Sequence, residues 1–94
     1  MISLVYLTTC SPSPLGAELT LAGYRVFEAL AVSEVLFLQE HEDIHAVIIA
    51  ANVLDQQAKA SQFRGIVISL KMHATAADVE WELSLLFPQP HTVQ

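Results

Sequence analysis

The spacing of apolar and polar residues along the chain predicts alternating strands and helices. Apolar runs of strand length occupy residues 2–7, 25–30, 46–51 and 66–70. Between and after these runs, apolar residues recur at the three- and four-residue spacing of helices, over residues 14–22, 34–40, 56–63 and 76–87. Strands that alternate with helices favour a parallel sheet covered on both faces. We therefore expect an α/β fold with three αβα layers around a short sheet of four parallel strands.

Residues that commonly start or stop helices lie at the boundaries of the four helical segments. Pro14 suits the first turn of the first helix, and Thr75 followed by Asp78 resembles a capping box. The other candidates are Ser33 and Asp55 as N-caps, Glu34 as an acidic first-turn residue, and Gly23 and Gly65 as helix stops.

The length of 94 residues suits one domain, which we expect to span residues 1–88 and to end in a flexible tail at residues 89–94. The chain is 53% hydrophobic and 15% charged, whereas soluble domains average about 45–50% and about 25%. No apolar run reaches the roughly 18–20 residues of a membrane span, so we expect no membrane association. The excess apolar surface then indicates a protein partner.

Charge and cysteine content exclude further classes of protein. Four Lys and Arg residues against ten Asp and Glu give a net charge of −6, and the basic residues form no cluster. Nucleic-acid binding needs a positive patch, so we do not expect it. The single cysteine, Cys10, permits no internal disulfide and fits a reducing compartment. No basic segment precedes the apolar N-terminal run, as a signal peptide would require. We therefore expect a cytoplasmic protein.

Three segments together resemble response-regulator receiver domains, a flavodoxin-like family. They are residues 22–29 (AGYRVFEA), 33–36 (SEVL) and 41–53 (HEDIHAVIIAANV). The resemblance covers residues 1–53 well and residues 54–87 more loosely. It implies a receiver-like fold that is about one βα unit shorter than the family's. Two alignments remain open. Ser69 matches the family's hydroxyl at the end of its fourth strand, or residues 66–71 match its fifth strand, with Lys71 as its lysine.

The resemblance also locates the chemistry that this chain lacks. The phosphoacceptor Asp of the family falls at Ala50, and the acidic pair that holds Mg²⁺ falls at Thr8 and Thr9. A methyl group accepts no phosphoryl group, and hydroxyls are poor Mg²⁺ ligands. We therefore expect a degenerate pocket of Thr8, Thr9, Ala50 and Ser69, no cofactor and no catalysis. The resemblance then implies a phosphorylation-incompetent module in signalling that binds protein.

A competing hypothesis comes from His41-Glu42-Asp43-Ile44-His45, a literal H-E-x-x-H sequence. On one helix, two histidines four residues apart share a face and can bind zinc, while the glutamate activates water. The alternative function is thus a small zinc-dependent hydrolase using His41, Glu42 and His45. The receiver-like interpretation instead places His41 at a helix end and His45 at a strand start.

Cys10 gives a third option, because some flavodoxin-like phosphotransfer proteins carry a nucleophilic cysteine at the end of the first strand. Such loops hold phosphate with backbone N–H groups. Pro12 and Pro14 remove two of these donors here. We therefore expect Cys10 to be a buried, inert thiol rather than the nucleophile of a phosphocarrier.

The last helical segment predicts an interface. Its apolar residues spread around more than one face, so Trp81 or Leu85 should point away from the core. Both could pack beneath the C-terminal tail, or they could form an oligomer interface. If the fourth strand is a sheet edge, a two-fold dimer buries that edge and this helix together. The predicted interface comprises Trp81, Leu85, Ser69 and Leu70.

Overall fold

A computed structural model describes residues 2–10 and 13–87 of the protein. The expected domain boundary at 88 and the tail at 89–94 lie outside this range. Four strands alternate with four helices in the order expected from the sequence. They are β1 (Ser3–Leu7), α1 (Pro14–Leu21), β2 (Arg25–Ala29), α2 (Val32–His41), β3 (Ala46–Ile49), α3 (Gln56–Ala60), β4 (Ile66–Ser69) and α4 (Ala76–Leu86).

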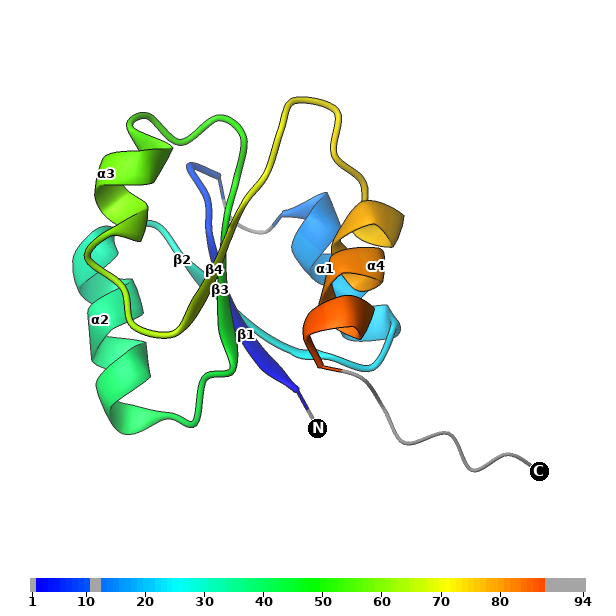
Figure 1. Ribbon diagram of the computed structural model, residues 1–94, viewed down its shortest axis with the longest axis horizontal. Helices are drawn as coiled ribbons and strands as arrows, with labels where there is room; N and C mark the ends of the chain where they lie inside the picture. Colours follow the sequence, from blue (N-terminus) through cyan, green and yellow to red (C-terminus); the bar gives the residue numbers. More distant parts are fainter. Residues whose placement is uncertain (1, 11–12, 88–94) are drawn as a thin grey trace.

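The four strands form one sheet in the order β2-β1-β3-β4, and every neighbouring pair is parallel. Helices α2 and α3 cover one face of the sheet and α1 and α4 cover the other (Figure 1). This arrangement confirms the predicted three-layer αβα fold, and its strand order is that of the flavodoxin-like class.

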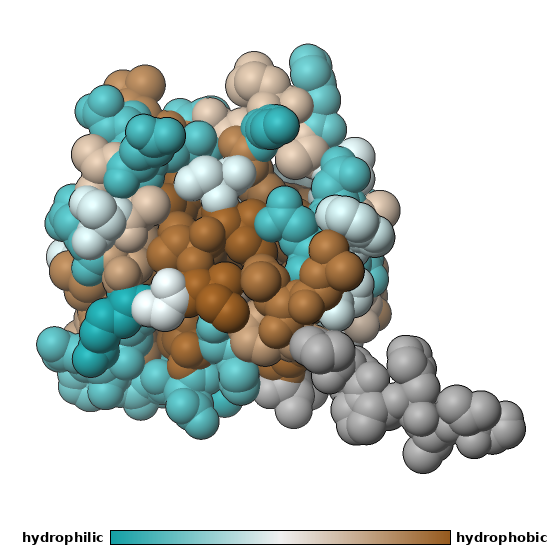
Figure 2. Space-filling view, viewed as in Figure 1, coloured by the Kyte–Doolittle hydropathy of each residue, from teal (hydrophilic) through white to brown (hydrophobic). Residues whose placement is uncertain are grey.

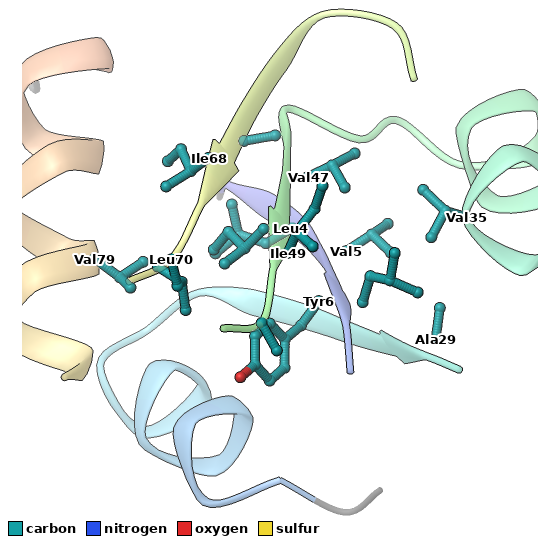
Figure 3. Packing of buried hydrophobic residues seen from close by; sticks show 14 of the residues in the cluster. Leu4, Val5, Tyr6, Ala29, Val35, Val47, Ile49, Ile68, Leu70 and Val79 are labelled. Atoms are coloured by element: carbon teal, nitrogen blue, oxygen red, sulfur yellow. The ribbon is translucent and has the colours of Figure 1, made fainter. Parts of the chain in front are cut away.

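The core lies on both faces of the two central strands. All residues of β1 and β3 are buried, as expected for parallel strands covered on both sides. Side chains alternate between the faces. Val5 and Val47 lie toward Val35 of α2, whereas Ile68 and Leu70 lie toward Val79 of α4 (Figure 3). The continuous apolar runs in the sequence follow from this two-sided burial.

Two helix termini agree with the capping residues read from the sequence. Pro14 opens α1, and Gly23 follows the helix with a φ of 106°, a left-handed conformation that favours glycine. At α4, the Thr75 hydroxyl accepts a hydrogen bond from the Asp78 N–H and the Asp78 carboxylate accepts one from the Thr75 N–H. The predicted capping box is therefore confirmed.

Two predicted N-caps are wrong. Helix α2 begins at Val32, so Ser33 lies inside it; the N-cap is Ala31, and Glu34 Oε1 accepts a hydrogen bond from the Leu30 N–H at 3.1 Å. Asp55 precedes α3 with a φ of 54° and makes no side-chain cap. An N-cap residue usually has an extended backbone, from which its side chain reaches the N–H groups of the first turn. The left-handed backbone of Asp55 directs its side chain elsewhere.

Helix α3 is also shorter than predicted. It ends at Ala60 rather than at residue 63, and Gly65, with a φ of 76°, leads directly into β4 instead of closing the helix. No helix in the described residues is long and apolar enough to cross a membrane.

Helix α4 returns to the face that already carries α1, and the two helices contact each other. Strand β4 pairs with β3 on one side. On its other side no strand of residues 2–10 and 13–87 pairs with it, so β4 is an edge of the sheet. The condition set for the predicted dimer, that the fourth strand is a sheet edge, is therefore met within the described residues.

Candidate functional site

A cleft of about 500 Å³ opens at the carboxyl ends of β1, β3 and β4. We call it the mouth cleft; its polar lining includes Thr8, Cys10, Ser13, Asn52, Lys71 and His73. The cleft lies where the strand order reverses between β1 and β3. Open α/β sheets commonly bind ligands at this position. Of the pocket predicted from the receiver resemblance, Thr8 and Ala50 line this cleft, whereas Thr9 lines a separate hollow.

The hydroxyls of both predicted threonines form hydrogen bonds in the loops beside the mouth cleft. The Thr8 hydroxyl accepts a hydrogen bond from the Cys10 N–H at 3.3 Å and donates one to the Cys10 carbonyl at 3.2 Å. The Thr9 hydroxyl accepts a hydrogen bond of 2.6 Å from the side-chain amide of Asn52. The Thr8 bonds close a turn within the loop after β1, and the Thr9–Asn52 bond links this loop to the loop after β3.

Ala50 presents a methyl group beside the ends of β1 and β3 and is 4% exposed. Its N–H donates to the Leu7 carbonyl at 2.9 Å. The side-chain amide of Gln56 donates to the carbonyls of Ile49, Ala50 and Leu70 at 3.3, 2.7 and 3.1 Å. One amide group thus ties together the carboxyl ends of β3 and β4.

Ser69, the fourth member of the predicted pocket, does not line the mouth cleft. It is exposed on β4 and borders a second groove, between β4 and α4. The structure therefore brings Thr8, Thr9 and Ala50 to one end of the sheet and places Ser69 at its edge.

Two carboxylates near the mouth cleft were not predicted from the sequence. Glu28 of β2 accepts a hydrogen bond from the Ser13 N–H at 2.9 Å, and Glu18 of α1 lines the cleft. The pKa of Tyr6 is raised, mainly because the phenol is buried and further because of the Glu28 charge, although a hydrogen bond with Ser13 opposes the shift. The sequence signal for Glu28 is a charged residue among the apolar residues 26–30.

The histidines of the H-E-x-x-H sequence lie on different elements and have different partners. Helix α2 ends at His41, whose Nδ1 lies 2.9 Å from the Phe37 carbonyl oxygen and whose ring stacks on the Phe37 ring at 4.1 Å. His45 precedes β3, and its Nδ1 accepts a hydrogen bond from the Ser3 N–H at 3.0 Å. The motif's zinc geometry needs both residues on one helix, and this arrangement does not provide it.

Glu42 lies outside the helix as well and forms an ion pair with Arg25 at 3.5 Å. Among residues 2–10 and 13–87, no three His, Cys, Asp or Glu side chains come together as metal ligands would.

Cys10 is exposed, so the prediction of a buried thiol is wrong. Strand β1 ends at Leu7, and the paired hydrogen bonds between Thr8 and Cys10 turn the chain outward. The thiol therefore lies at the rim of the mouth cleft instead of in the core.

The second surface runs along the edge strand and the neighbouring helix. We call it the β4–α4 face and define it by Ser69, Trp81 and Leu85. Trp81 is 65% exposed and Leu85 is 62% exposed, so both point away from the core, whereas the sequence predicted this for one or the other. Figure 2 shows apolar surface in the middle of this side of the molecule, between the two more polar helical layers.

A groove of about 420 Å³ lies within the β4–α4 face. Trp81 and Ser69 line it, and Leu70, which is buried and lies toward Val79, forms its floor (Figure 3). Its charged rim consists of Lys71, Asp78 and Glu82, together with His73. The predicted interface residues Trp81, Ser69 and Leu70 thus share one groove, and Leu85 lies one helical turn farther along α4.

The chain therefore offers two candidate surfaces. Hydrogen bonds connect the loops and strand ends around the mouth cleft, and the β4–α4 face combines an open sheet edge with exposed apolar side chains. No protein-family model, curated protein or solved structure matches the chain, so its function is argued from these two surfaces.

Proposed function

We propose that the protein is a non-catalytic, receiver-like interaction module that forms a homodimer through its β4–α4 face. The observation that carries the proposal is the exposed indole of Trp81 beside β4, an edge strand whose outer side pairs with no strand among the described residues. Trp is enriched in the energetically dominant centres of protein interfaces. An apolar sheet edge likewise favours association with another chain.

The mouth cleft supports a role without phosphoryl transfer. Ala50 stands where the receiver resemblance places the phosphoacceptor, and its side chain is only a methyl group. The nearby side-chain amide of Gln56 donates hydrogen bonds to the carbonyls at the strand ends. Glu28 is the carboxylate nearest the start of α1, and its hydrogen bond to Ser13 holds it against the backbone. In this proposal the cleft contributes stability rather than chemistry, and the module acts in signalling by contact alone.

We also propose a cytoplasmic location. The single cysteine is exposed, and an exposed thiol without an internal partner is best preserved in a reducing compartment.

Sedimentation equilibrium tests the dimer. The expected mass is near twice 10.3 kDa, and Trp81→Glu is expected to reduce it to that of a monomer without changing the circular dichroism spectrum. Phe37→Glu is a matched control, because Phe37 is also an exposed aromatic residue (58%) but lies in a groove with Phe27 of the opposite edge strand, β2. A wild-type monomer at high concentration would overturn the proposal.

Incubation with acetyl phosphate and Mg²⁺ tests the absence of phosphoryl transfer. Intact-mass measurement should show no added phosphoryl group, because Ala50 offers no carboxylate at the strand end. A stable adduct would show that another side chain accepts the phosphoryl group and would contradict this part of the proposal.

A further inference from the structure

Side chains of opposite charge, carried by two different elements, line the mouth cleft. Glu18 comes from α1, and Lys71 comes from the loop between β4 and α4, residues 70–75. Among residues 2–10 and 13–87, Arg25 and Glu42 form the one ion pair, so Glu18 and Lys71 do not neutralise each other. The cleft therefore presents a carboxylate and an ammonium group that are both available to a ligand.

The neighbouring titratable groups reinforce this separation of charge. The carboxylate of Glu28 accepts a hydrogen bond from a backbone N–H at the start of α1 and adds negative charge on that side. Asp78 is the acidic residue nearest to Lys71 in the sequence, but it caps α4 through Thr75 and does not line the cleft. His73 lines the cleft together with Lys71 and is cationic when protonated. The α1 side is thus acidic and the loop side is basic.

The floor of the mouth cleft is apolar. Tyr6, Ala50 and Leu70 are buried at the ends of β1, β3 and β4 and line it from below. Figure 3 shows Tyr6 and Leu70 on the face of the sheet that α1 and α4 cover. Leu15 and Met72 add apolar surface at the rim. The volume of about 500 Å³ lies within the roughly 300–1,000 Å³ of small-molecule sites.

These features select the chemistry of the ligand. A simple anion would be repelled by Glu18, and a simple cation would be repelled by Lys71. A zwitterion pairs with both side chains, which are exposed and long enough to turn toward it. An apolar group on the same molecule would cover the floor. An α-amino acid with an apolar side chain combines these three properties.

We propose that the mouth cleft binds a small apolar α-amino acid, whose ammonium group pairs with Glu18 and whose carboxylate pairs with Lys71. Binding involves no reaction, because the cleft is used only for recognition. The inference goes beyond the proposed function, since it gives the non-catalytic module a small-molecule ligand and does not depend on the homodimer.

Isothermal titration calorimetry at pH 7.5 tests the binding with leucine, isoleucine, methionine and phenylalanine. At least one of them should bind saturably with one site per chain. Its amide, which lacks the carboxylate, and its N-acetyl derivative, which lacks the ammonium group, should both bind more weakly. An absence of saturable binding by all four would overturn the proposal, and so would equal binding of either derivative.

The reactivity of Cys10 locates the ligand. Cys10 is the single cysteine of the chain, is exposed and lines the mouth cleft. The amino acid that binds best should slow alkylation of this thiol by iodoacetamide, and its N-acetyl derivative at the same concentration should not. Unchanged alkylation at full occupancy would place the ligand elsewhere and overturn the assignment to the cleft.

Charge-neutralising variants test the two pairings separately. Glu18→Gln and Lys71→Met should each weaken binding of the free amino acid about fivefold, which corresponds to about 1 kcal/mol. Lys71→Met should leave binding of the amide unchanged, because that ligand has no carboxylate. Glu40→Gln and Lys59→Met are the matched controls, since neither residue lines the cleft. Equal effects of the controls would assign the change to net charge and contradict the pairings.

The mass of the protein separates this inference from the proposed function. A dimer that binds none of the four amino acids would overturn the ligand site alone. A monomer that binds one of them in the mouth cleft would overturn the homodimer alone.

Discussion

The carboxylate of Glu28 on β2 accepts a 2.9 Å hydrogen bond from the backbone N–H of Ser13, the N-cap of α1. The two residues are 15 positions apart, and the bond fixes the start of α1 against the sheet. A carboxylate at this point also interacts favourably with the positive end of the helix dipole. The position of α1, which lines one side of the mouth cleft, therefore depends on the side chain of Glu28.

We predict that Glu28→Ala destabilises the protein by about 1–3 kcal/mol, because the substitution leaves the partly buried Ser13 N–H without its acceptor. Urea unfolding followed by circular dichroism measures the change. Glu40→Ala is the control, since Glu40 is exposed on α2 and surface changes of this kind usually stay within about 0.5 kcal/mol. Equal stability of the two variants would contradict a structural role for the Glu28 bond.

Gly16 provides a second test of the same contact. A helical Gly→Ala change normally stabilises by roughly 0.5–1 kcal/mol. Here a Cβ on Gly16 would lie 2.5 Å from Glu28 Oε2, so the carboxylate would have to shift and its bond to Ser13 would weaken. We expect Gly16→Ala to be less favourable in the wild type than in the Glu28→Ala variant. A double-mutant cycle measures this difference, and additive effects would contradict it.

Gln56 should contribute more to stability than its neighbour Gln57. Its amide donates to three strand-end carbonyls, whereas the Gln57 side chain is exposed. Gln56→Glu replaces the donor with a carboxylate facing those carbonyls, so we predict a loss of about 2–4 kcal/mol, near the range for unsatisfied buried groups. Gln57→Glu should change the free energy of unfolding by less than about 0.5 kcal/mol. Similar melting temperatures for the two variants would refute the bridging role of Gln56.

Alkaline pH should destabilise the fold through Tyr6. Burial, together with the Glu28 charge, raises the pKa of Tyr6 above its ordinary value. The folded state therefore favours the neutral phenol. Its contribution is fully present below the unfolded pKa, near 10, and is lost as the pH rises through the folded pKa.

The measurement is the free energy of unfolding between pH 8 and pH 11, compared with that of Tyr6→Phe. The variant should lose less stability over this interval. Tyr24, whose pKa is raised by partial burial and by the charge of Glu80, accounts for part of the remaining loss. Identical pH profiles for Tyr6→Phe and the wild type would exclude a contribution from Tyr6.

The order of strands and helices could be predicted because it depends on local patterns. The apolar runs of β1 and β3 are buried on both faces, and the Thr75–Asp78 capping box needs only four consecutive residues. The N-cap predictions at Ser33 and Asp55 failed because residue type alone does not fix the backbone conformation. Helix α2 begins one residue before Ser33, and no side chain caps its first turn.

The candidate surfaces could be predicted only in part. The exposure of Trp81 and Leu85 followed from too many apolar positions on one helix. The bonds of Glu28 to Ser13 and of Gln56 to Leu70 join different elements, and no spacing in the sequence marks them. Cys10 was placed in the core because it follows an apolar strand, whereas the Thr8 hydrogen bonds turn it to the surface.

Fluorescence of Trp81, measured together with sedimentation equilibrium, tests the central claim most directly. Trp81 is the single tryptophan of the chain and is 65% exposed. In the proposed homodimer the partner covers this indole, so its emission maximum should shift to shorter wavelength at protein concentrations that give a dimeric mass, and should return on dilution. A dimeric mass with an unchanged emission maximum would contradict an interface on the β4–α4 face.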